Sequence, residues 1–129
     1  MSEKQIITSE KAPKALGPYS VATRYGDLVF TSGQVGLDPV TNEMVAGGVE
    51  AETRQVLTNL KNVLEAAGSS LDCALKTTVF LRDMADFSKM NAIYAEFFVK
   101  NFPARSTVQV GALPKGAAVE IEVVACLAS

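Results

Sequence analysis

The chain of 129 residues has a formal net charge of −2, and hydrophobic residues make up 48% of it. This length fits one two-layered domain, which we expect to span residues 1–129. The absence of histidine removes the commonest general base and metal ligand, and the weak negative charge provides no basic surface for DNA or RNA. Triad hydrolases, zinc hydrolases and nucleic-acid-binding proteins are therefore disfavoured.

The N-terminal residues and the two cysteines favour a cytoplasmic protein. Residues 1–5 are polar where a signal peptide has an apolar core, and no apolar run approaches the roughly 20 residues of a membrane span. Cys73 and Cys126 are too few for a disulfide framework or a zinc site, so we expect each to be a small buried side chain. We predict no metal, no cofactor and no membrane contact.

The first part of the chain predicts strands joined by a loop and a tight turn. Residues 4–8 favour a short strand, after which prolines and glycines interrupt regular structure. Residues 20–25 and 28–32 are typical of strands, and Gly26-Asp27 between them predicts a hairpin turn. The glycines of Ser32-Gly33-Gln34-Val35-Gly36 permit either unusual backbone dihedrals or a close approach of the backbone to another group. The run lacks the spacing of a dinucleotide-binding or phosphate-binding loop, and we predict a turn or bulge.

An amphipathic helix and a central strand follow. From Val49 to Ala67, apolar residues recur at steps of three and four, and Gly68 suits the helix C-terminus. Residues 74–82 contain no turn residue, which predicts a central strand. The alternation of that strand assigns four residues to one face: Leu75, Thr77, Val79 and Leu81.

The last part of the chain predicts a second helix and two strands. Asp83 or Asp86 can cap the helix, which we expect to extend to about Val99. Residues 107–113 and 118–127 then alternate as strands on either side of a turn that contains proline and glycine.

The element order predicts an α+β fold with about six strands in a mixed sheet. Two helices of this size can cover only one face of such a sheet. The other face carries apolar residues such as Phe80 and Val124, so we expect a second copy of the chain to cover it. A cleft between subunits is then a natural ligand site.

One short stretch, Asn101 to Thr107, contains the main candidate for ligand binding. Pro103 disfavours a helical conformation at Phe102, so Arg105 should enter the sheet. A guanidinium held at the start of a strand can bind a carboxylate through two parallel hydrogen bonds. Arg105 therefore either binds a small carboxylate ligand or pairs with a carboxylate of the protein.

Two further polar residues are open to two interpretations. Asn91 falls inside the second predicted helix, where it is either a surface residue or a ligand contact. Glu120 is either an exposed strand carboxylate or a general base in the cleft. Apolar neighbours and the adjacent Glu122 favour a raised pKa for Glu120 in the second case.

Six pieces of the chain resemble, in order and spacing, the RidA (YjgF/YER057c/UK114) family. The resemblance covers essentially the whole chain. The pieces are Gly17-Pro18-Tyr19-Ser20, Thr31-Ser32-Gly33-Gln34, Lys76-Thr77-Thr78-Val79-Phe80-Leu81, Met90-Asn91-Ala92-Ile93-Tyr94, Phe102-Pro103-Ala104-Arg105-Ser106, and Leu113-Pro114-Lys115 through Glu120-Ile121-Glu122.

The resemblance implies a chorismate-mutase-like fold and a homotrimer with three sites between subunits. It also implies hydrolysis of reactive enamines and imines, 2-iminopropanoate and 2-iminobutanoate, to 2-oxo acids and ammonia. Arg105 would bind the substrate carboxylate, and Glu120 would position the water. The residues implied to line the pocket are Tyr19, Ser32, Gly33 and Asn91. Thr107 departs from the cysteine of many members, but its small polar group can still bind a ligand.

The residues are compatible with this chemistry on their own account. An imine is already electrophilic, so its hydrolysis needs positioning and proton transfer more than a strong nucleophile, and it needs no metal or cofactor. Two alternatives stay open. The same arginine could serve a non-catalytic protein that binds a 2-oxo acid or amino acid, or the chain could be an endoribonuclease, which the absence of histidine disfavours.

Overall fold

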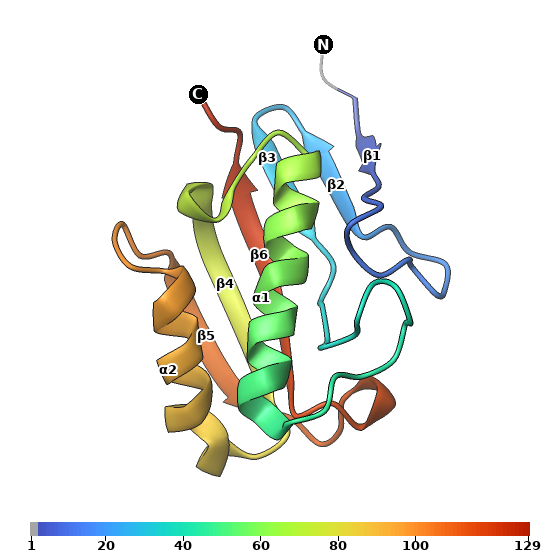
Figure 1. Ribbon diagram of the computed structural model, residues 1–129. Helices are drawn as coiled ribbons and strands as arrows, with labels where there is room; N and C mark the ends of the chain where they lie inside the picture. Colours follow the sequence, from blue (N-terminus) through green and yellow to red (C-terminus); the bar gives the residue numbers. More distant parts are fainter. Residues whose placement is uncertain (1–2) are drawn as a thin grey trace.

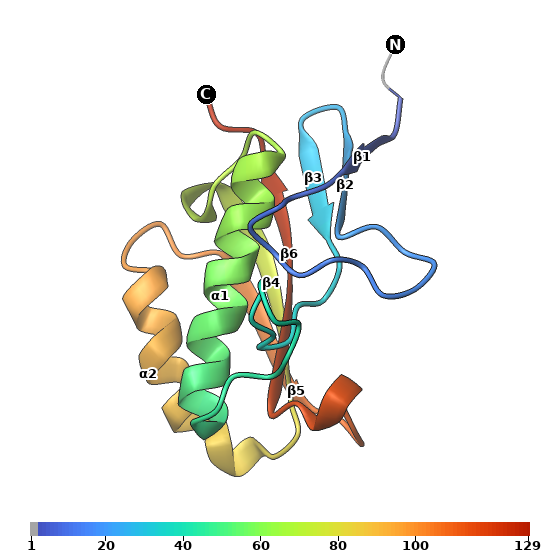
Figure 2. The same cartoon turned by 45° about the vertical axis from the view of Figure 1, so that its right-hand side comes forward.

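The computed structural model describes residues 3–129, so Met1 and Ser2 of the expected 1–129 domain lie outside the described residues. Within these described residues, six strands form one mixed sheet in the order β1-β2-β3-β6-β4-β5. Both α-helices lie on the same face of the sheet (Figures 1 and 2). The predicted α+β architecture, with its six-stranded mixed sheet and two helices on one face, is therefore confirmed.

The elements follow the predicted order. They are β1 (Gln5–Ile7), β2 (Ala22–Tyr25), β3 (Leu28–Thr31), α1 (Gly48–Ala66), β4 (Ala74–Leu81), α2 (Phe87–Phe97), β5 (Ala104–Gln109) and β6 (Val119–Cys126). β4 and β5 run parallel, and the other neighbouring strands are antiparallel. The parallel pair is joined by α2, because a parallel connection needs a crossover that a short turn cannot provide.

The core lies between α1 and the inner face of the sheet. All seven apolar residues that define the predicted face of the first helix are buried: Val49, Val56, Leu57, Leu60, Val63, Leu64 and Ala67. The alternating residues of β6 face them, and they are also buried: Val119, Ile121, Val123 and Ala125. Gly68 adopts a left-handed φ of 84° just after α1, as its predicted position at the helix C-terminus requires.

The face predicted for the central strand is wrong at one residue. Thr77, Val79 and Leu81 of β4 are fully buried, but Leu75 is 48% exposed. The pairing of β4 with β6 shifts register between Ala74 and Lys76. A bulged residue breaks the alternation of side chains, so Leu75 turns away from the core.

Three expectations about the second half of the chain need correction. The second helix ends at Phe97, and Val99 lies beyond it with 68% of its surface exposed. The strand expected from residue 107 begins earlier, at Ala104, and ends at Gln109. Neither Cys73 nor Cys126 is fully buried.

The face of the sheet that the helices leave open is partly apolar. Phe30 of β3 and Val108 of β5 are 43% and 44% exposed. Phe80 lies on β4 beside Val108 and opposite Glu120 of β6. A single copy thus leaves apolar side chains of several strands in contact with solvent.

Within residues 3–129, no helix has both the length and the apolarity needed to cross a membrane.

Candidate functional site

Arg105 lies on the edge strand β5 and faces α2. It pairs with Thr77, which is fully buried beneath that helix, so both side chains lie on the helix face of the sheet. Its Nη1 donates a hydrogen bond of 2.7 Å to Oδ1 of Asn91. The guanidinium carbon lies 4.7 Å from the ring centroid of Tyr94 and 5.5 Å from that of Phe87. One hydrogen bond and two cation–π contacts therefore hold the guanidinium in place.

This half-buried guanidinium has no carboxylate partner within the described chain. Across residues 3–129, the single ion pair joins Arg54 to Glu96 at 3.0 Å. Arg105 instead lines a pocket of about 420 Å³ between α2 and the start of β5. The prediction that Arg105 enters the sheet is confirmed. The alternative of pairing with a carboxylate is not realised within one copy.

The residues around Arg105 come from one face of α2. Phe87, Asn91 and Tyr94 are separated by steps of four and three, which bring side chains together on a helix. Asn91 is half-buried and orients Arg105, so it is more than a surface residue. Neither aromatic ring was among the predicted site residues. Their helical spacing from Asn91 is the signal that could have linked them to the site.

The Tyr94 hydroxyl is also fixed. It lies 2.8 Å from Oγ1 of Thr77, and either atom can be the donor. Burial raises the pKa of Tyr94, although the hydrogen bond to Thr77 and the charge of Arg105 oppose the shift. Tyr94 therefore stays neutral at pH 7 and presents its ring to the cation.

Thr107 follows Arg105 on the same face of β5. It pairs with Val79, whose side chain is buried on the helix side of the sheet. The Thr107 hydroxyl oxygen is buried and has no hydrogen-bond partner in residues 3–129. Buried hydroxyl groups normally have a partner, so this one can accept a ligand, a water molecule or a group from another chain.

Glu120 lies on the opposite face of the sheet. It pairs with Phe80, which alternates with the buried Val79 and so points to the open face. Its carboxyl group is about half buried. Burial, with a further contribution from the Glu122 carboxylate, raises the pKa of Glu120 above its usual value, in the predicted direction.

The Glu120 carboxylate packs against the backbone of Gly33. A Cβ atom at Gly33 would lie 2.1 Å from Oε2 of Glu120, so a side chain there would displace the carboxylate. Gln34 and Ile121 exchange backbone hydrogen bonds of 2.9 and 3.1 Å, which hold this segment along β6. Of the two roles expected for this glycine, close approach of the backbone to another group is therefore the one that requires glycine at position 33.

Tyr19 and Ser32 line one pocket, and Ser32 directly precedes Gly33 in the chain. Ser32 Oγ donates a hydrogen bond of 2.6 Å to the carbonyl of Ser20, which ties the end of β3 to the loop that carries Tyr19. Both residues line a pocket of about 390 Å³ together with Phe30 of the open face. Ser32 and Tyr19 are thus next to each other but separated from Arg105 by intervening strands.

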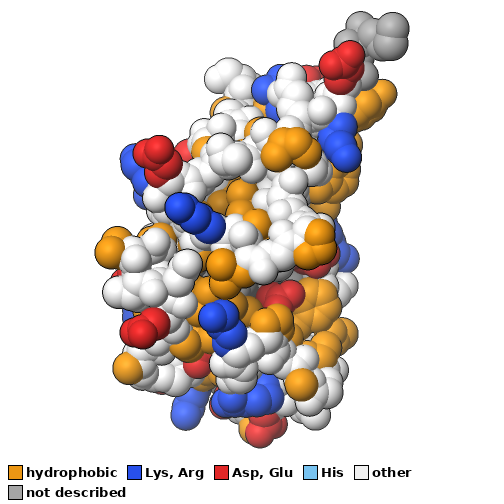
Figure 3. Space-filling view, turned by 90° about the vertical axis from the view of Figure 1, so that its right-hand side faces the viewer, with side chains coloured by type: hydrophobic (Ala, Val, Ile, Leu, Met, Phe, Trp, Pro, Cys, Tyr) orange, Lys and Arg blue, Asp and Glu red, His pale blue; other side chains and the backbone are white. Residues whose placement is uncertain are grey.

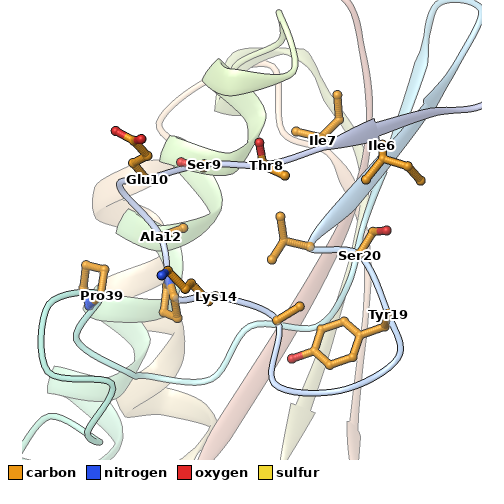
Figure 4. A pocket seen from close by; sticks show the side chains of 13 residues that line it. Ile6, Ile7, Thr8, Ser9, Glu10, Ala12, Lys14, Tyr19, Ser20 and Pro39 are labelled. Carbon is orange, nitrogen blue, oxygen red and sulfur yellow. The ribbon is translucent and has the colours of Figure 1, made fainter.

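A larger pocket of about 600 Å³ lies between β1 and the following loop. Figure 4 shows Tyr19 at one end of this pocket and Ile6 and Ile7 of β1 nearby. Hydrophobic side chains reach the surface in several places on this side of the molecule (Figure 3). Lys14 and Glu10 supply its charges, but neither Arg105 nor Glu120 lines it. We therefore do not place the candidate site there.

The predicted site residues form two groups in one copy of the chain. Arg105, Asn91 and Thr107 lie on the helix face at the β5 edge, whereas Glu120 and Gly33 meet at the open face. β4 lies between β5 and β6 in the sheet. The first group can bind a carboxylate and the second can exchange a proton. Only a contact between two copies could bring them to one ligand.

Among residues 3–129, no three His, Cys, Asp or Glu side chains are arranged to hold a metal.

Comparisons with known proteins agree over nearly the whole chain. The sequence model described as Endoribonuclease L-PSP matches residues 9–127. The human 2-iminobutanoate/2-iminopropanoate deaminase is 47% identical over 122 residues, which cover 95% of this chain and 89% of that protein. The chloroplastic Reactive Intermediate Deaminase A of Arabidopsis thaliana is 49% identical over 125 residues, covering 97% of this chain and 67% of that protein.

Solved structures support the same relationship. The crystal structure of E. coli TdcF with bound serine matches with a TM-score of 0.92 and 41% identity. The match covers 96% of this chain and 99% of TdcF. The extent of the sequence match, the identities and the shared fold lead to one conclusion. The chain belongs to the RidA family, which the matching sequence model describes as Endoribonuclease L-PSP.

Proposed function

We propose that the protein hydrolyses 2-imino acids such as 2-iminopropanoate and 2-iminobutanoate to 2-oxo acids and ammonia. The observation that carries this proposal is Arg105, a half-buried guanidinium oriented by Asn91 and two rings, without a carboxylate partner in residues 3–129. A substrate carboxylate would supply that partner. The names of the human and Arabidopsis relatives, both deaminases, support the reaction class.

We infer that the site forms between copies of the chain. Arg105 and Glu120 lie on opposite faces of one sheet, so a ligand that contacts both needs the second residue from a neighbour. The exposed Phe30 and Val108 of the open face would be covered in the same contact. The resemblance to the family implies that three copies close into a ring, which gives three equivalent sites.

The proposed reaction starts from a bound and electrophilic carbon. Arg105 binds the carboxylate and fixes the imine carbon beside it. Glu120 of a neighbouring copy accepts a proton from water as the water oxygen bonds to that carbon, and the electrons of the C=N bond move to nitrogen, which takes up a proton. The amino nitrogen of this carbinolamine then takes the proton held by Glu120, and the hydroxyl loses its proton to solvent as the C=O bond forms, which replaces the proton that nitrogen first took up. The C–N bond breaks and ammonia leaves. One water is consumed for each 2-oxo acid and ammonia formed.

The raised pKa of Glu120 suits this role. A general base works best when its pKa approaches the working pH, because it then binds the proton strongly while still being deprotonated. Burial and the Glu122 carboxylate both move the pKa of Glu120 in that direction. The reaction as written needs no metal or cofactor, because the imine carbon is already electrophilic.

The remaining predicted residues would shape the pocket. Asn91 orients Arg105, and the partnerless hydroxyl of Thr107 is available to the ligand. Gly33 leaves room for the Glu120 carboxylate beside the backbone. Tyr19 and Ser32 line the pocket next to Phe30. This pocket of one copy would complete the site beside Arg105 of the neighbouring copy.

A second candidate is a protein that binds a small carboxylate without turnover. The serine bound to E. coli TdcF favours it, since an amino acid carries a carboxylate but no imine. Ammonia release from freshly generated 2-iminopropanoate separates the two. An enzyme accelerates release above the spontaneous rate, and Arg105→Ala abolishes the acceleration, whereas a binder takes up pyruvate and leaves the rate unchanged. We do not propose RNA cleavage for this chain, which has no histidine.

A further inference from the structure

The two cysteines of the chain are 53 positions apart in the sequence but lie next to each other in the fold. Cys73 ends a short turn directly before β4, and Cys126 is the last residue of β6. Ala74 pairs with Ala125, so continuing this antiparallel register by one residue places Cys73 opposite Cys126. The pair therefore lies at the end of the sheet from which β6 leads to the C-terminus (Figure 1).

Side-chain contacts agree with this placement. The thiol of Cys126 donates to the carbonyl oxygen of Cys73, with the sulfur 3.6 Å from that oxygen. The sulfur of Cys73 in turn accepts a hydrogen bond of 3.4 Å from the hydroxyl of Ser70. Hydrogen bonds that involve a thiol are weak. Each sulfur is therefore held by a contact that costs little to break.

The spacing of the backbone suits a disulfide. Residues that face each other across antiparallel strands have Cα atoms about 4.5 to 5.5 Å apart, and disulfides join Cα atoms that are about 4.4 to 6.8 Å apart. Rotation about χ1 moves each sulfur without moving the backbone. Both cysteines are half-buried, so part of each side chain is open to a small reagent.

We propose that Cys73 and Cys126 form a reversible disulfide on contact with a small-molecule disulfide such as oxidised glutathione. The thiolate of one cysteine attacks a sulfur of the reagent, which forms a mixed disulfide and releases one glutathione. The thiolate of the other cysteine then attacks the protein sulfur of that mixed disulfide, and its bond to the second glutathione breaks. The protein loses two electrons and two protons, and the two glutathione molecules receive them.

The cross-link would join the start of β4 to the end of β6, which are neighbouring interior strands of the sheet. It would close a loop between residues 53 positions apart, so it restricts the unfolded chain and stabilises the fold. Arg105 and Glu120 pair with residues further along β4, and neither takes part in the bond. The disulfide is thus independent of the proposed function, and the outcome of the imine assay has no bearing on it.

The test treats the intact, folded protein with oxidised glutathione and then blocks the remaining thiols. Mass spectrometry should show a single chain that is lighter by two hydrogen atoms and carries no glutathione. Proteolysis should release the peptides of Cys73 and Cys126 joined to each other. The midpoint of thermal unfolding should rise by roughly 5 to 15 °C. Excess reduced glutathione should reverse all three changes.

Cys73→Ser and Cys126→Ser are matched controls, because each variant keeps one thiol and replaces the other by a hydroxyl of similar shape. Neither variant should lose two hydrogen atoms, and neither should gain stability on treatment. Thermal unfolding of the untreated variants checks that the fold is kept. The joined peptides are sought in the unaltered protein, so they decide the question even where a serine variant unfolds.

Four outcomes would overturn the inference. In the first, glutathione stays attached to the unaltered protein. In the second, the new bond joins two chains instead of two residues of one chain. In the third, the thiols react only after a denaturant has unfolded the protein. In the fourth, the internal bond forms but the unfolding midpoint does not rise.

Discussion

Replacing Gly33 by alanine tests whether the position of the Glu120 carboxylate matters. The added Cβ would lie 2.1 Å from Oε2, 2.7 Å from Cδ and 2.9 Å from Cγ of Glu120, so the whole carboxyl end must move. Ordinary contact needs more than 3 Å, so the carboxylate retreats by about 1 Å, and a displacement of that size costs a rate factor of about 10². We expect Gly33→Ala to lower turnover of 2-iminopropanoate by about this factor.

The assay follows ammonia release with the spontaneous rate subtracted. Gly111→Ala is the matched control, because nothing lies within 4 Å of a Cβ at that glycine. Thermal unfolding of both variants checks that the fold is kept. Affinity for pyruvate should change much less than turnover, since Arg105 of the neighbouring copy still binds the pyruvate carboxylate.

A double mutant identifies the route of the effect. If Gly33→Ala acts through Glu120, combining it with Glu120→Gln should be no worse than Glu120→Gln alone, because the base is already lost. Near-full turnover of a folded Gly33→Ala protein would refute the reasoning. So would equal losses in the Gly33→Ala and Gly111→Ala proteins.

The other predictions concern charge, proton transfer and assembly. Arg105→Ala should weaken pyruvate binding by about 2 to 4 kcal/mol, and Arg105→Lys should recover little, because a point charge does not reproduce the planar fork; near-full activity of the lysine variant would contradict the carboxylate contact. Glu120→Gln should lower turnover by about 10² to 10⁴ with little change in pyruvate affinity; unchanged turnover would exclude Glu120 as the base. Because its pKa is raised, Glu120 becomes protonated at a higher pH than an ordinary glutamate. On acidification, turnover should therefore begin to fall at a correspondingly higher pH. The residual turnover of Glu120→Gln should not show this fall. Sedimentation should show a homotrimer at micromolar concentration; a well-folded monomer that still hydrolyses imines would rule out the shared site.

Local sequence patterns determined the elements and most of the core. The apolar spacing of Val49 to Ala67 defines one face of a helix whatever it packs against, and all of that face is buried. The alternation in β6 likewise separates Ile121 from Glu120, because successive side chains of a strand point to opposite faces. Pro103 ends the helical region locally, so the entry of Arg105 into a strand also follows from neighbouring residues.

Only the tertiary structure decided how the candidate site is divided. The prediction that Arg105 and Glu120 lie on neighbouring strands is wrong, because β4 lies between β5 and β6. Strand register also separates the two faces, since it puts Arg105 beside Thr77 on the helix face and Glu120 beside Phe80 on the open face. Register depends on pairing between residues distant in the chain, and a shift by one residue would reverse the face. The contact between Gly33 and Glu120 likewise joins residues that no local pattern relates. Periodicity determines which residues share a face of one element, whereas pairing between elements determines which of those faces meet.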